Sequence, residues 1–431
     1  MAFYGVAVLV LATVFGALDR QILILLAEPM RHSLQLSDTQ LGLLQGMGFS
    51  LFSGLAAVPI GWLADRYGRR VVLAGCVSVW AVATAACGLV HGFPALFAAA
   101  AGMGMGEAAI VPIIYGLIPE LVSERRRPLA NGIYMLAGLL GGGLGIALGG
   151  LLLNHLETIS LLVPAGLRGL DTWRLAFICV AVPGPFIAAL ILTIGGRRSR
   201  EGERAEAAPE RHVAGAGYFR ANLQTLASVF VGIGLAQLGL AATAIWLPVI
   251  AARSYGAAAA DIGQAMGTAY MVGTAAGALF GVCIMPRLRR RTGLAMSTRV
   301  IVGGLSVAAA VVFAVLFAHQ AGQLYVLFGL QMAAVTAPTL LVPTLLQDIT
   351  PTSLRSRAIA AGSFVMIALT SMSPLLVGAL SDALADTTQG LRAAAVIVGV
   401  VSLASAAVLL RSAQGAIVST VKGLNAGMKT P

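Results

Sequence analysis

Twelve long apolar runs constrain what this chain of 431 residues can fold into. Each run has the ~20 residues that an α-helix needs to cross the hydrocarbon core of a bilayer. Because that core offers no water to backbone N–H and C=O groups, a chain crosses it as helices or as a closed barrel. We therefore predict an all-α membrane protein with twelve transmembrane helices, over residues 3–29, 38–63, 71–91, 94–120, 128–154, 173–195, 219–251, 260–285, 296–317, 322–347, 357–380 and 390–410.

Composition excludes several other classes of protein. Charged residues make up 10% of the chain, whereas soluble domains carry ~25%. The formal charge of +11 would favour a nucleic-acid partner in a soluble protein. Here the basic residues lie in short loops between apolar runs, so we expect no nucleic-acid partner. The cysteines and histidines lack metal-site spacing, and no hydrolase or P-loop motif occurs. We expect no enzyme activity, no metal and no cofactor.

One long polar stretch, GGRRSREGERAEAAPERH at 195–212, separates six of the runs from the other six. It predicts an N-terminal six-helix bundle over 1–195, a linker over 196–217, a C-terminal six-helix bundle over 218–411 and a tail over 412–431. The basic loops match between the halves, 61–70 with 281–293 and 120–132 with 348–362. Two such repeats predict pseudo-symmetric halves with a binding site between them at the bilayer midplane.

Arginines concentrate in the loops that follow the even-numbered runs and in the linker. Cytoplasmic loops of membrane proteins carry such an excess of basic residues. We therefore expect both termini and the linker to be cytoplasmic, in a bacterial-type plasma (inner) membrane. We expect a monomer whose partners are membrane lipids and a small-molecule substrate.

The first apolar run contains an acid and a base, Asp19 and Arg20, in TVFGALDRQILILL, and the fourth contains Glu107 in AAGMGMGEAAIVP. A charge in the middle of a span costs several kcal/mol unless it is paired or faces water, so such residues indicate function. Adjacent helical residues point ~100° apart, so Asp19 and Arg20 should meet different partners. Gly102 and Gly106 thin one face of the fourth helix and favour close packing there.

The loop GWLADRYGRRVVL at 61–73 resembles the signature loop of the major facilitator superfamily. The resemblance extends over the whole chain and implies the superfamily's fold of two six-helix halves. It also implies a cytoplasmic latch in which Asp65, Arg69 and Glu120 stabilise one conformation. The loop residues assigned to this latch are Gly61, Asp65, Arg66, Gly68, Arg69, Arg70 and Glu120. Alternatively, these arginines only orient the chain and bind lipid headgroups.

The run LDRQILILLAEPMRHSLQLSDTQLGLL, with GMGMGEAAIVP, resembles the Spinster group of proton-coupled lipid transporters. The resemblance implies that Asp19, Arg20 and Glu107 converge on a central cavity. Asp19 and Glu107 would then carry the coupling protons, with Arg20 as their charge partner or substrate contact. The group's arginine in the fourth helix is replaced by Ala100. The alternative is an ion triad that only fixes helix packing.

By the same analogy the seventh and tenth helices form the opposite, mostly apolar wall of the cavity. The cavity candidates there are Gln237, Trp246, Gln331 and Thr336. A charged wall facing an apolar wall favours an amphiphilic substrate of lysophospholipid or sphingoid type, and less well a hydrophobic drug. A carrier of small organic anions held by Arg20 is an alternative, and so is a lipid-binding receptor or scaffold that does not transport. The fifth run, GGGLGIALGG at 141–150, resembles an antiporter motif without its proline, but such glycines also pack helices in general.

Overall fold

The computed structural model describes residues 2–108, 110–160, 169–195, 215–292, 296–351, 354–384 and 389–427. All regular structure in these ranges is helical. The N-terminal half contains α1 (Ala2–Leu25), α2 (Ala27–Leu34), α3 (Asp38–Leu43), the π-helix η1 (Leu44–Leu51), α4 (Phe52–Tyr67), α5 (Arg69–Leu89), α6 (Phe93–Glu107), α7 (Ile110–Leu121), η2 (Glu124–Arg126), α8 (Arg127–Ser160), α9 (Thr172–Ala181) and α10 (Pro183–Thr193). The C-terminal half contains α11 (Gly215–Ala221), α12 (Leu223–Tyr255), α13 (Ala259–Thr292), α14 (Met296–Ala314), η5 (Val315–Phe317), α15 (Ala321–Asp348), α16 (Arg355–Ala383), α17 (Gly390–Ser412) and α18 (Gln414–Gly427).

Twelve helices in the described residues are long and apolar enough to cross a membrane, which confirms the predicted all-α membrane fold. Several boundaries differ from the prediction by up to four residues, and the first and seventh spans are examples. The first span ends at Leu25 rather than at residue 29, because the helix breaks there and Ala27–Leu34 continues as the separate α2. The seventh span begins at Leu223 and runs to Tyr255, where Gly256 ends it with a φ of +63°, a conformation that glycine adopts readily.

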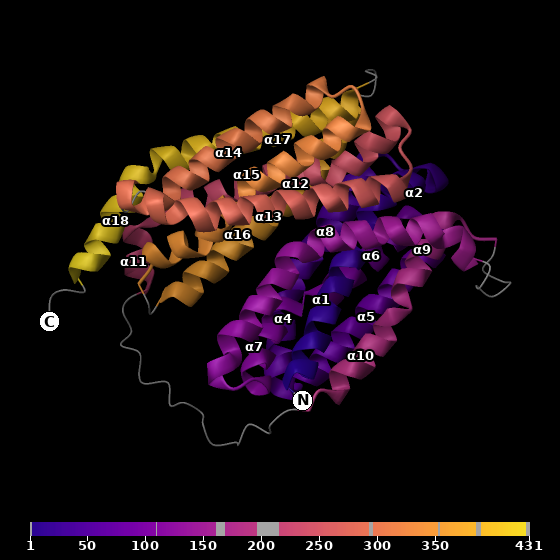
Figure 1. Ribbon diagram of the computed structural model, residues 1–431, viewed down its shortest axis with the longest axis horizontal. Helices are drawn as coiled ribbons and strands as arrows, with labels where there is room; N and C mark the ends of the chain where they lie inside the picture. Colours follow the sequence, from indigo (N-terminus) through magenta and orange to yellow (C-terminus); the bar gives the residue numbers. More distant parts are fainter. Residues whose placement is uncertain are drawn as a thin grey trace.

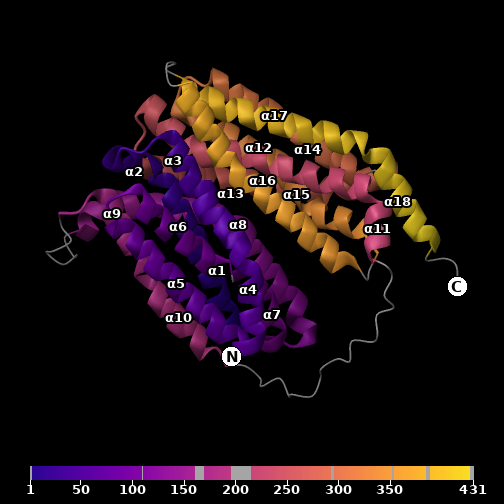
Figure 2. The same ribbon diagram turned by 180° about the vertical axis from the view of Figure 1, so that it is seen from behind.

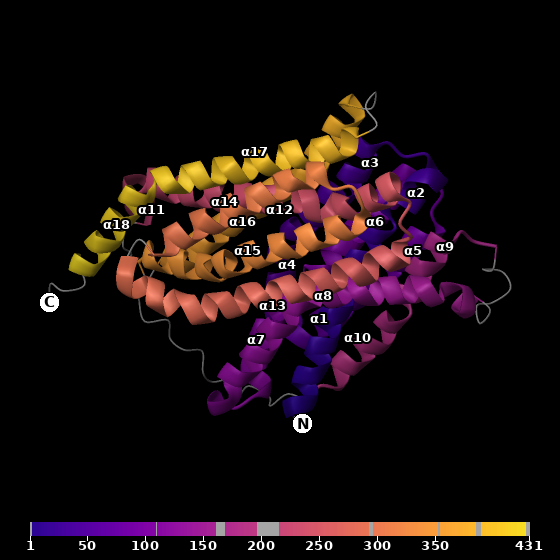
Figure 3. The same ribbon diagram turned by 45° about the horizontal axis from the view of Figure 1, so that its top comes forward.

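The two halves form a V (Figure 1). They meet near α2, α3 and the adjoining ends of α12 and α16, and they diverge toward the chain's N terminus on one arm and α11 and α18 on the other (Figures 1 and 2). We call the meeting point the closed end and the opposite end the linker end. Figure 3 shows α8 and α13 lying side by side along one seam between the halves. Of the predicted linker, residues 196–214 lie outside the described residues, whereas Gly215–Ala221 forms α11.

Glycines bring the helices of this seam into backbone contact. A Cβ on Gly263 of α13 would lie 2.7 Å from the backbone N of Gly150 on α8. On another face of α8, a Cβ on Gly145 would lie 2.7 Å from the carbonyl carbon of Ala17 on α1. The glycine-rich run at 141–150 therefore packs α8 against both α1 and the other half, as such runs do in membranes generally.

Matching arginines support the internal repeat. Arg174, at the start of the sixth span, donates through Nη1 to the carbonyl of Val90 at 2.6 Å. Arg392, at the start of the twelfth, donates through Nη1 to the carbonyl of Ala318 at 3.0 Å. The accepting carbonyls follow the third and ninth spans, so each half ties its last span to its third in the same way. Both arginines are 6% exposed.

Candidate transport site and its gates

Asp19 lies on α1 and turns toward α5. Its carboxylate accepts hydrogen bonds from Nε1 of Trp80 and from Oγ1 of Thr84, the latter at 2.8 and 2.9 Å. It is 2% exposed, and in the described part of the chain it pairs with no cation. Asp19 is thus buried with neutral donors alone.

The helix packing predicted at Gly102 and Gly106 positions one of these donors. A Cβ on Gly106 of α6 would lie 2.7 Å from the backbone N of Trp80, and one on Gly102 would lie 3.0 Å from Cβ of Ala83. α6 therefore packs directly on α5, and Trp80 fills the space beside Gly106. Trp80 and Thr84 were not among the predicted site residues, although their i, i+4 spacing places both side chains on one face of α5.

Arg20 turns in another direction and pairs with Glu107. Its Nη2 lies 2.7 Å from Oε1 of Glu107, and its guanidinium lies 5.1 Å from the centroid of the Phe49 ring. The side chain of Glu107 is 15% exposed and that of Arg20 is 49% exposed. Asp19 and Arg20 therefore meet different partners, as their helical spacing predicts. Instead of one triad, the structure has an ion pair and a separate carboxyl group with neutral partners.

The π-helix η1 places Phe49 beneath Arg20. π-Helical segments inside helices are rare and often occur at functional sites. α6 packs closely on this segment, because a Cβ on Gly104 would lie 3.0 Å from the carbonyl carbon of Phe49. Ala100, also on α6, is 0% exposed, so an arginine in its place would need space that this packing does not provide.

Three of the four cavity candidates on the seventh and tenth spans are buried within the C-terminal half. Gln331 is 2% exposed and exchanges hydrogen bonds with Thr243, through Nε2 to Oγ1 at 2.8 Å. Thr336 is 6% exposed and donates to the carbonyl of Met332. Trp246 is 1% exposed, and its Nε1 has no hydrogen-bond partner among the described residues. These three side chains pack inside the C-terminal half, whereas Gln237 is partly exposed.

At the linker end, Asp65, Arg69 and Glu120 come together within the N-terminal half. Nη1 of Arg69 lies 2.7 Å from Oε1 of Glu120, and Nη2 lies 3.5 Å from Oδ1 of Asp65. Arg70 extends this cluster with an Nη2 3.9 Å from Oε2 of Glu120 and an Nη1 that donates to the carbonyl of Ile194. The structure brings together the three residues of the predicted latch. Its role in stabilising one conformation stays a prediction.

The other latch residues surround this cluster. Gly68 joins α4 to α5 with a φ of +95°, which glycine adopts far more readily than other residues. Arg66 lies over the Trp62 ring, 5.3 Å from its centroid. A Cβ on Gly61 would have no described heavy atom within 4 Å, so the space beside this glycine is open.

At the closed end, Arg253 of α12 bridges the two halves. Its Nη2 lies 2.8 Å from Oε2 of Glu28 and 2.9 Å from Oδ1 of Asp38. Arg31 also approaches Asp38, at 3.3 Å, and Ser381 of α16 donates to it at 2.7 Å. The side chains of Glu28 and Asp38 are only 10% and 5% exposed, so this pair of acids depends on the bridging cations.

A second connection reinforces the closed end. Asp382 of α16 accepts hydrogen bonds from the backbone N of Thr39 at 2.9 Å and from its Oγ1 at 2.6 Å. Gly378, one turn earlier, allows α16 to touch α3, because a Cβ there would lie 2.7 Å from the carbonyl carbon of Asp38. Sequence reasoning missed the contacts between the halves at the closed end, because these partners are more than 200 positions apart and have no local spacing.

Comparison with known proteins agrees with this architecture. Residues 9–298 match the sequence profile of the Major Facilitator Superfamily. An MFS-type efflux pump of Mycolicibacterium smegmatis is 27% identical over 89% of this chain and 86% of the pump. Human protein spinster homolog 1 is 29% identical over 33% of this chain and 28% of its own. A probable L-galactonate transporter of Escherichia coli is 32% identical over 41% and 36%.

Solved structures show the same fold. A bacterial homologue of the human lysosomal transporter Spinster, in an inward-facing and unoccupied conformation, superposes with a TM-score of 0.79 at 20% identity, covering 98% of this chain and 97% of its own. The nucleoside transporter NupG superposes with a TM-score of 0.65 at 15% identity, covering 97% of this chain and 99% of its own. These matches are to transporters and not to enzymes.

Proposed function

Because the chain belongs to the Major Facilitator Superfamily, we propose that it is a proton-coupled secondary active transporter of an amphiphilic substrate, a lysophospholipid or sphingoid-type lipid. The Arg20–Glu107 ion pair within the spans carries this proposal. Membrane spans tolerate such charges mainly where they serve transport or proton transfer. Human spinster homolog 1 and the mouse sphingosine-1-phosphate transporter SPNS2 are relatives of part of the chain, which supports a lipid substrate.

The ion pair offers a means of coupling. Arg20 is half exposed while Glu107 is largely covered, so an anionic headgroup can approach Arg20 from its open side. A headgroup that takes over the guanidinium leaves Glu107 without its cation. A carboxylate without a cation inside a span is costly, so Glu107 would then take up a proton. Asp19, held by neutral donors, is the second proton-carrying candidate.

The linker end offers an apolar surface for the tail of such a substrate. α4 and α16 approach each other near Gly54 and Ile367, where a Cβ on the glycine would lie 2.6 Å from Cγ2. Toward the linker end, Val58 of α4 is 79% exposed and Phe364 of α16 is 66% exposed. These residues replace Trp246, Gln331 and Thr336 as the proposed contacts of the tail.

Alternating access would result if the closed end opened while the linker end closed. In this conformation the closed end joins the halves through Arg253, Glu28 and Asp38. For the opposite conformation Arg253 must leave both acids while the linker end closes. We place the linker end in the cytoplasm of a bacterial-type cell, in a protein that works as a monomer, because the basic loops gather there.

The test is uptake of a labelled lysophospholipid into proteoliposomes with an imposed proton gradient. We expect uptake that depends on the gradient and falls at least tenfold in Glu107→Gln. The matched control is Glu124→Gln, whose side chain is 88% exposed and, among the described residues, pairs only with the nearby Arg127 at 3.5 Å. Uptake that does not depend on the proton gradient, or that is equal in Glu107→Gln and Glu124→Gln, would overturn proton coupling through Glu107.

A carrier of small organic anions is the second candidate, with Arg20 as the anion contact. The Escherichia coli probable L-galactonate transporter and the Bacillus subtilis hexuronate transporter, 30% identical over 32% of this chain, favour it. If a sugar acid is taken up and a lysophospholipid neither is transported nor competes, the substrate assignment moves to this class. Binding of lysophospholipid without any transport would indicate a receptor or scaffold.

A further inference from the structure

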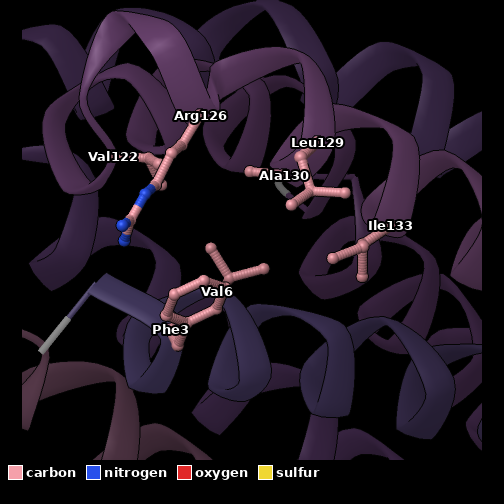
Figure 4. A pocket seen from close by; sticks show the side chains of 7 residues that line it. All are labelled: Phe3, Val6, Val122, Arg126, Leu129, Ala130 and Ile133. Atoms are coloured by element: carbon pink, nitrogen blue, oxygen red, sulfur yellow. The ribbon is translucent and has the colours of Figure 1, made fainter.

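A shallow apolar groove lies at the linker end of the N-terminal half, where the start of α1 faces the turn between α7 and α8 (Figure 4). It contains about 300 Å³ of space, part of it open to the surroundings. Its apolar lining consists of Phe3, Val6, Val122, Leu129, Ala130 and Ile133. Arg126 completes the lining, and the proposed transport mechanism uses none of these residues.

The groove lies near the ends of two membrane-spanning helices, and span ends are where acyl chains meet lipid headgroups. Phe3 is the first residue of the first span, and Leu129 and Ile133 lie near the start of the fifth, which begins at Glu124. The three residues are 62%, 58% and 40% exposed. Large apolar side chains gathered at a span's end are stable when hydrocarbon covers them, so the surface suits a lipid chain.

Arg126 gives the groove a charged mouth. Its guanidinium lies 5.6 Å from the centroid of the Phe3 ring and forms no ion pair with a described residue. Its neighbour Arg127, by contrast, is 3.5 Å from the carboxylate of Glu124. A guanidinium without an acidic partner, at headgroup depth, matches the geometry and charge of a phosphate.

We propose that this groove binds one acyl chain of an anionic glycerophospholipid from the bilayer, with the lipid phosphate against Arg126. The chain packs between Phe3 of α1 and Leu129 and Ile133 of α8, and so links the ends of two helices that pack along much of their length. The bound lipid stabilises the linker end of the N-terminal half. It is a resident lipid and not the transported substrate.

The experiment uses the purified, delipidated full chain in detergent. Dioleoyl-phosphatidylglycerol and dioleoyl-phosphatidylethanolamine are titrated separately, with native mass spectrometry for occupancy and thermal unfolding for stabilisation. We expect the anionic lipid to bind at least tenfold more tightly than the zwitterionic one. Arg126→Gln should remove that preference, and Arg125→Gln, on the same turn but outside the groove, should keep it.

Two further probes separate the chain from the phosphate. Ile133→Trp adds bulk at a partly exposed edge of the groove and should weaken binding of both lipids. Glycerol phosphate, which has no acyl chain, should bind at least tenfold more weakly than the anionic lipid. Equal losses in Arg126→Gln and Arg125→Gln, no loss in Ile133→Trp, or tight binding of glycerol phosphate would each overturn the proposal. Because no transport is measured, these results do not depend on the proposed function.

Discussion

At the closed end, Arg253 reaches across from the C-terminal half to Glu28 and Asp38, whereas at the linker end Arg69 reaches Asp65 and Glu120 of its own half. Each cluster sets one central arginine between two acids. The side chains of Glu28 and Asp38 are 10% and 5% exposed. Those of Asp65 and Glu120 are 73% and 29% exposed.

The comparison teaches that similar ionic chemistry can restrain different motions. A cluster between the halves opposes their separation, and burial makes its loss costly. A cluster inside one half braces helices that move together, and exposure weakens each of its pairs. Of these two clusters, only the one at the closed end therefore joins the halves in this conformation, which gives the two ends unequal sensitivity to mutation.

The largest effect is expected for Arg253→Gln. It leaves two buried acids without their bridging cation, a loss that typically costs about 3–5 kcal/mol for a buried pair. The closed end should open, so a single cysteine at Ser381, which is 4% exposed and contacts Asp38 of the other half, should react with a maleimide on the order of 100-fold faster. Arg69→Gln is the control and should leave that rate unchanged. An equal increase of the maleimide reaction rate in both variants would contradict the proposed difference between the two ends.

Replacing a glycine with a larger residue should also have different effects at the two ends. Gly378→Val forces a side chain against the backbone of α3, where a Cβ would lie 3.0 Å from the N of Thr39. Such overpacking costs about 1–3 kcal/mol and should lower the midpoint of thermal unfolding. Gly61→Val, with no atom within 4 Å of its Cβ position, should leave the midpoint unchanged. If linker-end closure brings α4 against the other half, this second variant should still slow transport.

An intermediate loss of stability is expected at Asp19, which lies between the two ends. Trp80→Phe removes the indole donor from the buried Asp19 and should cost about 1–3 kcal/mol, measured by chemical unfolding in detergent. Trp246→Phe is a matched control, since its Nε1 has no partner among the described residues and its removal leaves no acceptor unpaired. A larger loss from Trp246→Phe would show that packing, rather than the hydrogen bond, dominates at these sites.

The smallest effect concerns Asp171, in the loop before the sixth span. The hydrogen bond from Oγ of Ser33, at 2.6 Å, lowers the pKa of this carboxyl below its ordinary 3.8. A lowered folded-state pKa stabilises the protein above pH 3.8 and loses that contribution as the pH falls through the folded value. The unfolding midpoint of Asp171→Asn should therefore be slightly low at pH 7 and approach that of the unmodified chain near pH 3. A difference that persists unchanged to pH 3 would contradict this assignment.

The fold and the local clusters could be predicted from the sequence because their signals are local. Apolar runs marked the twelve spans, and the loop around Gly68 placed Asp65 and Arg69 one helical turn apart across it. The separate partners of Asp19 and Arg20 followed from helical geometry alone. In each case, neighbouring positions in the chain determine the outcome.

Contacts between distant segments could not be predicted in this way. Trp80 and Thr84 meet Asp19 because α5 packs beside α1, and Arg253 meets Glu28 because the halves dock. Gln331 was expected in a cavity because it is polar, yet Thr243 satisfies it inside the C-terminal half. Polarity alone does not distinguish a cavity wall from a buried hydrogen bond.

The central claim is that the closed-end cluster holds one of two alternating conformations. The most direct test measures distances between pairs of spin labels, one pair at each end of the protein, by electron spin resonance. Spin labels at His91 and Gln320 report the closed end, and labels at Ser123 and Arg220 report the linker end, with the four native cysteines replaced. Relative to an otherwise unmodified chain, Arg253→Gln should lengthen the first distance and shorten the second. Lengthening of the first distance with no change in the second would contradict a closed-end cluster that holds one of two alternating conformations.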